Sequence, residues 1–364
     1  MKVAVIIDTW FPFVGGGQIN AWEISKNLAS RGVKIDIITR NNGRYKDIKV
    51  KNLRVIKLGK ETSAGNIVSK ILFTLKALLF LYKSDYDLVH AHAFLPGIIA
   101  RLVMVFKGTP AIFTVHGTSL NTSLNGKLSK IIEKFILTQI LYGSQITVSR
   151  DFLKIKNVNR KIVYIPNGVD QQFIKSSPRS SRLKNVLLFV GRLHPQKNLT
   201  NLVEAIKILN IEKFPVILVI VGDGPQKLEI QNLIKKFKLE SNIKLEGSKY
   251  SPELLEHYQT ASALIMPSIY EGQSLTLLEA WASKLPVIVS KTGDIEYLVK
   301  EGVNGYFIKD QRHPSNIADS IKKAFSNKNL NKLGQNGYLL VKNSFSWEKT
   351  ATATLKVYEN VSKS

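Results

Sequence analysis

Two carboxylates stand eight residues apart in the segment SIYEGQSLTLLEA: Glu271 and Glu279. The apolar run 263–268 before them predicts a buried strand, and 274–283 predicts a helix. Glu271 then falls in the loop between the two and Glu279 inside the helix, near apolar residues where a carboxylate needs partners. Such carboxylates can accept hydrogen bonds from sugar and ribose hydroxyls, and the free amides near Ser274–Thr276 attract a phosphate. The segment therefore indicates a ligand in which a sugar is joined to a nucleoside diphosphate.

A basic loop follows another predicted strand at residues 191–198, GRLHPQKN. Arg192 offers a planar fork of donors and Lys197 a compact charge, a combination that suits a diphosphate. A solvated basic loop is the simpler alternative in so basic a chain. Ligands of open parallel sheets bind beyond the carboxyl ends of the strands, however, and this favours the diphosphate. VGDGP at 221–225 predicts a tight turn in which Asp223 caps the next helix.

The first half of the chain places glycines and histidines at strand ends as well. The triple glycine 15–17 lies between the first predicted strand and its helix, where its amides can line up on an anion. His116 ends the strand AIFTVHG and is expected to reach the site. His90 and His92 have no third ligand at a clear spacing and are interpreted as structural or site-lining. GGGQIN only approximates a nicotinamide-binding fingerprint, because Asn20 replaces its third glycine.

Short Val- and Ile-rich strands alternate with helices in both halves, the pattern of parallel sheets covered on both faces. The strands are expected at 3–8, 33–39, 53–58, 87–92, 111–117, 145–150 and 161–170, and then at 185–191, 214–222, 242–247, 263–268, 286–290 and 304–308. The polar stretch 171–184 between the two series is the expected linker. A last helix starts near Ser346 and carries one apolar stripe, which must cover another surface.

Composition favours a two-domain protein made for a reducing compartment. The 364 residues exceed the usual size of one core, and the absence of cysteine excludes disulfides and thiolate metal sites. The start MKVAVIIDTW predicts a strand rather than a signal peptide, and no uncharged apolar run is long enough to span a bilayer.

The net charge of +25 implies an anionic partner, such as a nucleotide phosphate, a lipid headgroup or a nucleic acid, although a solvated basic surface explains much of it. Residues 1–170 contain 25 Lys and Arg against 10 Asp and Glu, and the remainder contains 27 against 17. Residues 66–83, interrupted by Lys70 and Lys76, predict either a mostly buried helix or a basic amphipathic helix on an anionic membrane.

These motifs, together with PNGVD at 166–170, resemble in order and spacing the family 4 retaining glycosyltransferases of GT-B fold, across nearly the whole chain. The resemblance implies an α/β protein with two Rossmann-like domains whose parallel sheets face a central cleft, and a C-terminal helix that crosses back to the first domain. The implied domains are 1–173, completed by 346–364, on the acceptor side, and 174–345 for the nucleotide-sugar donor. Transfer with retention, often by a front-face route without a protein nucleophile, and independence of metal or other cofactors are implied as well.

The resemblance also implies roles for single residues. Those implied in catalysis are His116, Arg192, Lys197 and Glu271. Those implied in donor binding are Gly16, Gly17, Arg192, Lys197, Gly247, Glu271, Ser274, Leu275, Thr276 and Glu279. Arg192 and Lys197 would bind the diphosphate, Glu279 the ribose and Glu271 the sugar. The sequence departs from the family at Gln273 and Ser274, where an aromatic residue and a glycine are common, at Lys284 in place of a glycine, and at Trp281 in place of a smaller apolar residue.

We therefore predict a hexosyltransferase that uses a UDP- or GDP-sugar and a glycan or lipid-linked hydroxyl acceptor. A sugar-nucleotide epimerase of the same fold is the nearest alternative. A nucleic-acid-binding protein is a further one, although no such module is recognisable and no nucleic acid is expected as partner. The expected location is cytoplasmic, peripheral at the inner face of the cell membrane, with an anionic membrane surface as a candidate partner.

Overall fold

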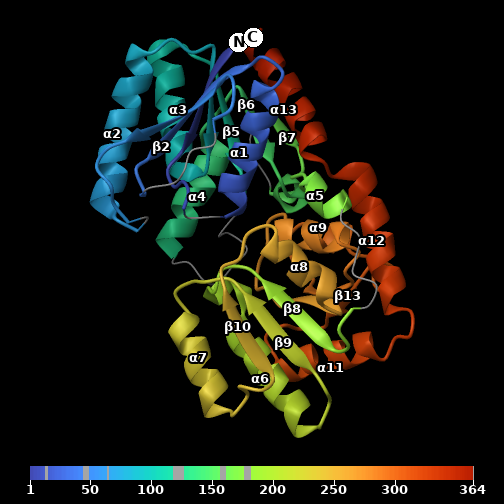
Figure 1. Ribbon diagram of the computed structural model, residues 1–364. Coiled ribbons are helices and arrows are strands. Elements are labelled where there is room, and N and C mark those ends of the chain that lie inside the picture. Colours follow the sequence, from blue (N-terminus) through green and yellow to red (C-terminus); the bar gives the residue numbers. More distant parts are fainter. Residues whose placement is uncertain are drawn as a thin grey trace. The chain divides into compact units, whose positions relative to one another are not determined.

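The chain folds into two compact units, each built on its own sheet (Figure 1). The structure, a computed structural model, describes residues 1–12, 15–43, 49–63, 65–117, 127–155, 161–175 and 182–363. Unit 1 comprises Met1–Gly168 and Trp347–Ser364, and unit 2 comprises Val169–Ser346. Both sheets are parallel and flanked by helices, so the predicted α/β fold class is confirmed.

The sheet of unit 1 has the strand order β3-β2-β1-β4-β5-β6-β7, and every neighbouring pair is parallel. Its strands are β1 (Lys2–Ile7), β2 (Lys34–Arg40), β3 (Leu53–Leu58), β4 (Leu88–His92), β5 (Ala111–Val115), β6 (Ser144–Thr147) and β7 (Ile162–Tyr164). The central strands β4 and β5 are buried at every position, as expected when helices cover both faces of a parallel sheet.

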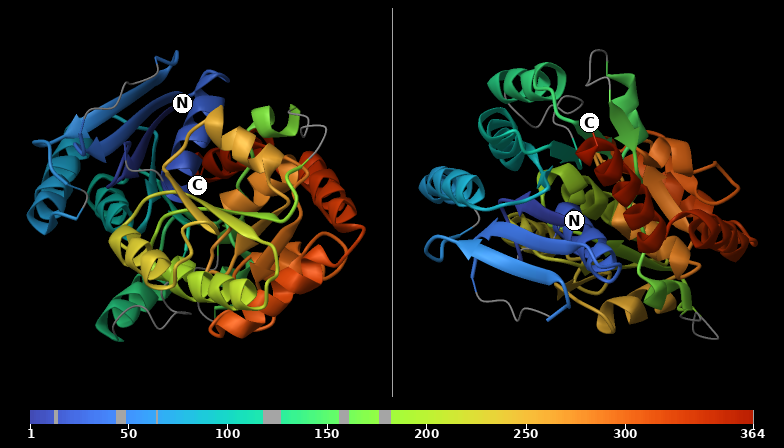
Figure 2. Two further views of the ribbon diagram at one scale, coloured as in Figure 1. Left: turned by 60° about the horizontal axis from the view of Figure 1, so that its bottom comes forward. Right: turned by 90° about the horizontal axis from the view of Figure 1, so that it is seen from above.

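Two layers of helices cover this sheet (Figure 2). Helices α1 (Gly16–Ala29) and α13 (Trp347–Ser362) share one apolar core with one face of the sheet. Helices α2 (Ile67–Lys83), α3 (Phe94–Lys107) and α4 (Lys127–Gln139) share a second core with the other face, to which the short η1 (Arg150–Lys154) contributes Phe152. The last helix of the chain thus belongs to the first unit, because its buried Ala351 and Tyr358 complete the core around α1.

The sheet of unit 2 has the order β10-β9-β8-β11-β12-β13 and is also parallel throughout. Its strands are β8 (Val186–Val190), β9 (Ile217–Val221), β10 (Ile243–Gly247), β11 (Ala263–Met266), β12 (Val287–Ser290) and β13 (Tyr306–Ile308). Strand β8 pairs with both β9 and β11, so the chain leaves β8 toward one edge of the sheet and β11 toward the other. This reversal is the topological switch point at which ligands bind in open parallel sheets.

The helices of unit 2 also form two layers. One core contains α6 (Leu199–Ile211), α7 (Lys227–Lys236) and α11 (Pro314–Phe325), and α12 (Leu330–Ser344) reaches it through Leu333. The other contains α5 (Gln171–Lys175), α8 (Glu253–Thr260), α9 (Leu275–Ala282), α10 (Ile295–Leu298) and the end of α12. The expected linker 171–184 begins with α5, whose Phe173 is buried against Tyr258, so this part of it belongs to the core of unit 2.

Candidate functional site

The loops that follow β8 and β11 are bonded to each other at the switch point of unit 2. After β8 the chain forms the short helix η2 (Pro195–Lys197), and the amide of Ile269 donates to the carbonyl of Gln196 at 2.8 Å. The side chain of Gln196 donates to the carbonyl of Tyr270 at 2.8 Å. Asn198, left-handed at φ 59°, donates from its side chain to the carbonyl of Pro267 at 3.1 Å. These hydrogen bonds hold the basic loop 191–198 against the start of the loop that follows β11 and contains Glu271.

Lys197 and Glu271, which the sequence assigned to different parts of the ligand, form an ion pair. Lys197 Nζ lies 2.6 Å from Glu271 Oε1, and the Lys197 side chain is 21% exposed against 8% for Glu271. The hydroxyl of Ser268 donates to the same carboxylate oxygen at 2.6 Å. The Glu271 carboxylate therefore accepts two hydrogen bonds at Oε1, one from the Lys197 ammonium and one from the Ser268 hydroxyl. The pair holds the ammonium in a fixed position beside Glu271.

Arg192 stands in the same loop, where its side chain is exposed and forms no hydrogen bond or ion pair with the described residues. Its neighbour His194 accepts a hydrogen bond from the amide of Gln196. Burial lowers the pKa of His194, and the nearby charges of Arg192 and Lys197 lower it further. The loop thus presents an exposed guanidinium and, five residues on, an ammonium paired with Glu271, two groups that are able to bind phosphate oxygens.

The glycines of the neighbouring loops allow the strand ends to approach closely. A side chain on Gly222, whose φ is +145°, would overlap the carbonyl oxygen of Gly191, and one on Gly224 would overlap the backbone of Leu193. Asp223 does not cap α7 as predicted. Its carboxylate accepts from the amide of Gly224 and from Lys227, whereas the N-cap of α7 is Gln226. Gly247 at the end of β10 has φ +69° and open space above it.

The first turn of α9 contains two of the backbone amides that were predicted to bind the donor, those of Leu275 and Thr276. Ser274 is the N-cap, and its hydroxyl accepts from the amide of Leu277 at 3.3 Å, so this predicted donor residue caps the helix with its side chain. The hydroxyl of Thr276 donates to the carbonyl of Val190 at the end of β8, at 3.4 Å. The amides of Leu275 and Thr276 lie in the first turn, where a helix has no acceptor of its own for them.

Glu279 lies on α9 and is half-buried, with its Oε2 accepting a hydrogen bond from the Tyr258 hydroxyl at 2.8 Å. Burial raises the pKa of Glu279 to about 7, the hydrogen bond from Tyr258 opposes this, and the charge of Asp170 raises it further. Burial also raises the pKa of Tyr258 well above its usual range, so the phenol remains a donor. Oε1 of Glu279 accepts no hydrogen bond from the described residues, so it could accept one from a ligand hydroxyl.

Three supporting residues escaped the sequence analysis. Tyr258 lies on α8 and reaches Glu279 only through tertiary packing, so no local sequence motif predicts this hydrogen bond. Gly293, with φ +53°, has no room for a side chain because a Cβ there would overlap the carbonyl of Glu271. Ser268 was visible as the residue three before Glu271, and its role as hydrogen-bond donor could have been proposed.

In unit 1 the predicted glycines and His116 lie together at the start of α1. Gly15 precedes the helix, Gly16 has open space at its Cβ position, and a Cβ on Gly17 would lie 3.4 Å from the His116 ring. His116 Nε2 lies 2.9 Å from His92 Nδ1, and the two rings stack. The glycine amides and one imidazole therefore meet at the carboxyl end of this sheet.

The other histidines form a buried chain behind His116. His90 bonds through Nδ1 to the Tyr358 hydroxyl at 2.7 Å and through Nε2 to the Thr114 hydroxyl at 2.6 Å. Burial lowers the pKa of His116 to about 4, of His90 to about 3 and of His92 well below its usual range. All three rings are neutral near pH 7. The site-lining interpretation thus fits His92, while His90 is structural and ties β4 to α13.

Two departures from the family pattern have physical accounts. Lys284 has φ +57°, the left-handed backbone anticipated for a residue that replaces glycine. Trp281 fits because Gly337 on α12 leaves space for its ring and because its indole donates to the carbonyl of Asn304 at 3.0 Å. Trp281 lies within α9 and anchors it against α12, whereas Lys284 lies in the turn that follows the helix.

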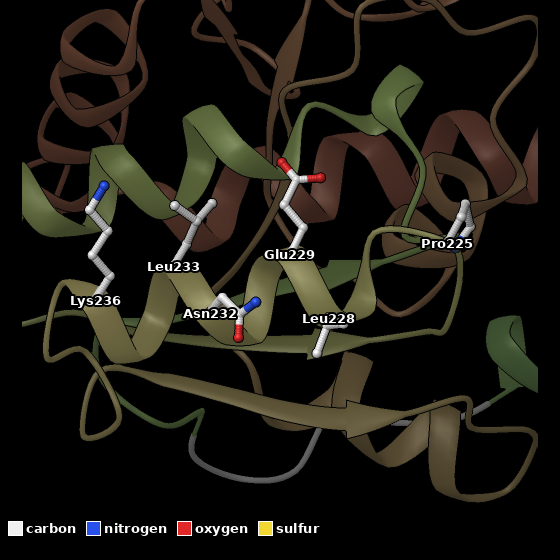
Figure 3. Close-up of a pocket in the computed structure, with 6 residues that line it drawn as sticks. All are labelled: Pro225, Leu228, Glu229, Asn232, Leu233 and Lys236. Carbon is white, nitrogen blue, oxygen red and sulfur yellow. The ribbon is translucent and has the colours of Figure 1, made fainter.

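The hollow shown in Figure 3 lies beside α7 and contains none of the predicted site residues. Its volume is about 480 Å³, and its lining residues are Pro225, Leu228, Glu229, Asn232, Leu233 and Lys236. Its acid, Glu229, already accepts from Thr200 and Gln226. Within the described part of the chain, no group of three or more His, Asp or Glu is arranged to hold a metal ion.

Comparison with known proteins covers both units. Residues 170–340 match the family model "Glycosyl transferases group 1", and residues 14–173 match "Glycosyltransferase Family 4". The chain is 27% identical to the Escherichia coli UDP-Gal:alpha-D-GlcNAc-diphosphoundecaprenol alpha-1,3-galactosyltransferase, over 98% of this chain and 97% of that protein. Its fold is similar to that of sucrose-phosphate synthase from Thermosynechococcus elongatus, with TM-score 0.86, 21% identity and coverage of 99% and 98%. Anabaena HepE in complex with UDP and glucose gives TM-score 0.81 and 17% identity, with 99% of each chain covered.

Proposed function

Because the chain belongs to the glycosyltransferases of GT-B fold, we propose that it transfers a sugar from a UDP- or GDP-sugar to a hydroxyl acceptor, with retention and without a metal ion. The observation that carries this proposal is the Lys197–Glu271 ion pair, which lies at the switch point of unit 2, in the loops that contain the exposed Arg192 and lead to α9. One loop cluster thereby offers cations and a carboxylate to the two halves of a sugar diphosphate.

We assign the donor to unit 2. Arg192 and Lys197 bind the diphosphate, together with the amides at Leu275 and Thr276. Glu279 accepts a ribose hydroxyl at Oε1 while Tyr258 holds Oε2. Glu271 accepts from hydroxyls of the transferred sugar, and Ser274 shapes the turn. The open space above Gly247 suits the flat face of a base.

We assign the acceptor side to unit 1, where His116 presents a neutral imidazole, and we keep for the backbone amides of Gly16 and Gly17 the proposed role of binding the donor diphosphate. A neutral ring can donate to or accept from a sugar hydroxyl without adding charge. In the reaction, the bond from the anomeric carbon to the diphosphate breaks while the acceptor oxygen bonds to that carbon on the same face. The acceptor proton passes to the departing phosphate oxygen.

Charge that develops on the departing diphosphate is stabilised by Arg192 and Lys197, which are in place before the reaction begins. Ionised Glu271 keeps the Lys197 ammonium at one point of the loop. This division of labour supplies, from side chains, the stabilisation that other sugar transferases obtain from a divalent cation.

The acceptor we propose is a lipid-linked or glycan hydroxyl, and we place the reaction at the inner face of the cell membrane. The support is the E. coli relative, whose name gives a GlcNAc-diphosphoundecaprenol acceptor. A panel of nucleotide sugars identifies the sugar and the base of the donor.

The test is a donor panel of UDP-glucose, UDP-galactose, UDP-GlcNAc and GDP-mannose, each with and without a short-chain polyprenyl diphosphate GlcNAc, in buffer containing EDTA. We expect release of the nucleoside diphosphate with one donor, and a product whose anomeric configuration, read by NMR, equals that of the donor. Conversion to an isomeric sugar nucleotide without nucleotide release would instead identify an epimerase. Loss of activity in EDTA that added Mg²⁺ restores would overturn the metal-free mechanism.

A further inference from the structure

The helix layer formed by α2, α3 and α4 in unit 1 exposes many large apolar side chains. Of the 23 exposed large apolar side chains in the described part of the protein, 12 lie on these three helices. They are Ile67, Val68, Ile71, Leu72, Leu75, Leu79 and Tyr82 on α2, Val105 and Phe106 on α3, and Ile131, Ile132 and Phe135 on α4. We call this set the α2–α4 face. Helix α2 packs against α3, and α3 against α4, so these side chains lie on neighbouring helices. Large exposed apolar surfaces usually mark an interaction site.

Helix α2 shows why the face cannot be explained by packing within unit 1. Its core side is made by Ser69, Phe73, Ala77 and Leu81, which are buried. The opposite side, at four-residue spacing, carries Ile71, Leu75 and Leu79, exposed by 58%, 54% and 62%. A surface helix of a globular protein normally places charged and polar residues on that side.

Among the described side chains of α2, α3 and α4, every exposed charge is a lysine. Lys76 and Lys83 are exposed on α2, and neither α2 nor α3 contains an Asp or Glu. Helix α4 adds the exposed Lys127 and Lys134, and its acid Glu133 is buried. An apolar stripe flanked by lysines, whose long stems let the ammonium reach outward, matches the chemistry of an anionic lipid surface.

We propose that the α2–α4 face docks this protein on an anionic lipid bilayer, with Ile71, Leu75 and Tyr82 entering the headgroup region and the lysines meeting lipid phosphates. No helix of the described residues is long and apolar enough to cross a bilayer, so the contact is peripheral. A second copy of the chain fits the face less well, because a two-fold contact through α2 would set Lys76 and Lys83 against the same charges of the partner.

The test measures sedimentation of the whole protein with vesicles of phosphatidylcholine alone and of phosphatidylcholine with an equal amount of phosphatidylglycerol. We expect binding to the anionic vesicles, weakened by salt as lysine–phosphate contacts are screened. The double variant Ile71→Glu with Leu75→Glu should bind them at least ten-fold more weakly. The matched control is Ile211→Glu in unit 2, since Ile211 is exposed by 69% and lies outside the face. It should bind like the unchanged protein.

Each outcome decides the proposal. Absence of binding to anionic vesicles, or equal loss in the double variant and the control, would overturn it. Concentration-dependent self-association that the double variant abolishes would replace the bilayer by a second copy. The readout needs no catalysis, so the docking inference stands or falls independently of the proposed transfer reaction. A circular dichroism spectrum and a melting temperature equal to those of the unchanged protein show that the double variant is folded.

Discussion

Lys197 Nζ lies 2.6 Å from Glu271 Oε1, across the loops that follow two neighbouring strands of unit 2. The pair couples the residue proposed for the diphosphate to the residue proposed for the sugar. A change at one of them therefore alters the charge environment of the other, and neither acts as an isolated ligand.

The first prediction concerns Glu271→Gln. The amide cannot balance the Lys197 charge, so we expect turnover to fall at least ten-fold while the dissociation constant for the nucleoside diphosphate alone stays within about three-fold, since that ligand lacks the sugar. Steady-state kinetics and calorimetric titration check this. The matched control is Glu301→Gln, which breaks an exposed pair of equal length with Lys323 and should change neither quantity. Unchanged turnover in Glu271→Gln would remove this residue from the site.

The second prediction compares Arg192→Ala with Lys197→Ala. Charge on the leaving diphosphate grows in the transition state, so each change should reduce turnover by roughly 100- to 1000-fold and weaken donor binding less. Lys291→Ala, at an exposed lysine of the same unit, is the control and should leave turnover as it was. A reduction below about ten-fold at both positions would show that these are solvated loop charges.

The third prediction follows from the raised pKa of Glu279, about 7. Ribose hydroxyls donate to the ionised carboxylate, so donor binding favours loss of the proton and affinity for UDP or GDP should rise as the pH increases from 6 to 8. Glu279→Gln should bind more weakly at pH 8, by roughly 1.5–3 kcal/mol, and lose this part of the pH dependence. The phosphates of the ligand titrate equally in both proteins, so the difference between their calorimetric curves isolates Glu279. Parallel curves would contradict the ribose assignment.

The sequence predicted the strands and the two sheets well, because apolar runs are local patterns. It also located Gly, Arg, Lys and acidic residues at the strand ends, and the roles of these residues stay predictions. What it missed depends on contacts between distant segments. Tyr258 reaches Glu279 from another helix, and His92 reaches His116 from a neighbouring strand. The interpretation of 66–83 as a mostly buried helix was wrong for its outer side, since hydropathy gives apolar character but not which side is covered.

The last prediction assigns His92 a positioning role toward His116. Its Nδ1 lies 2.9 Å from His116 Nε2, so the tautomers of the two rings are coupled: one of these nitrogens carries the proton and the other accepts it. His92→Ala should lower turnover about ten-fold with little change in donor binding, and His92→Gln, which keeps a hydrogen-bonding group there, should recover part of it.

The pH profile of turnover tests whether His92 acts through His116. Burial holds the pKa of His116 at about 4, so His116 stays neutral above that pH, and removing the His92 ring admits water that restores solvation of the charged form. The acid limb of the turnover profile should therefore rise toward 6.5 in His92→Ala, and nitrogen NMR shifts of the His116 ring should follow it. An acid limb that stays in place while turnover falls would mean that His92 supports only the packing of the sheet.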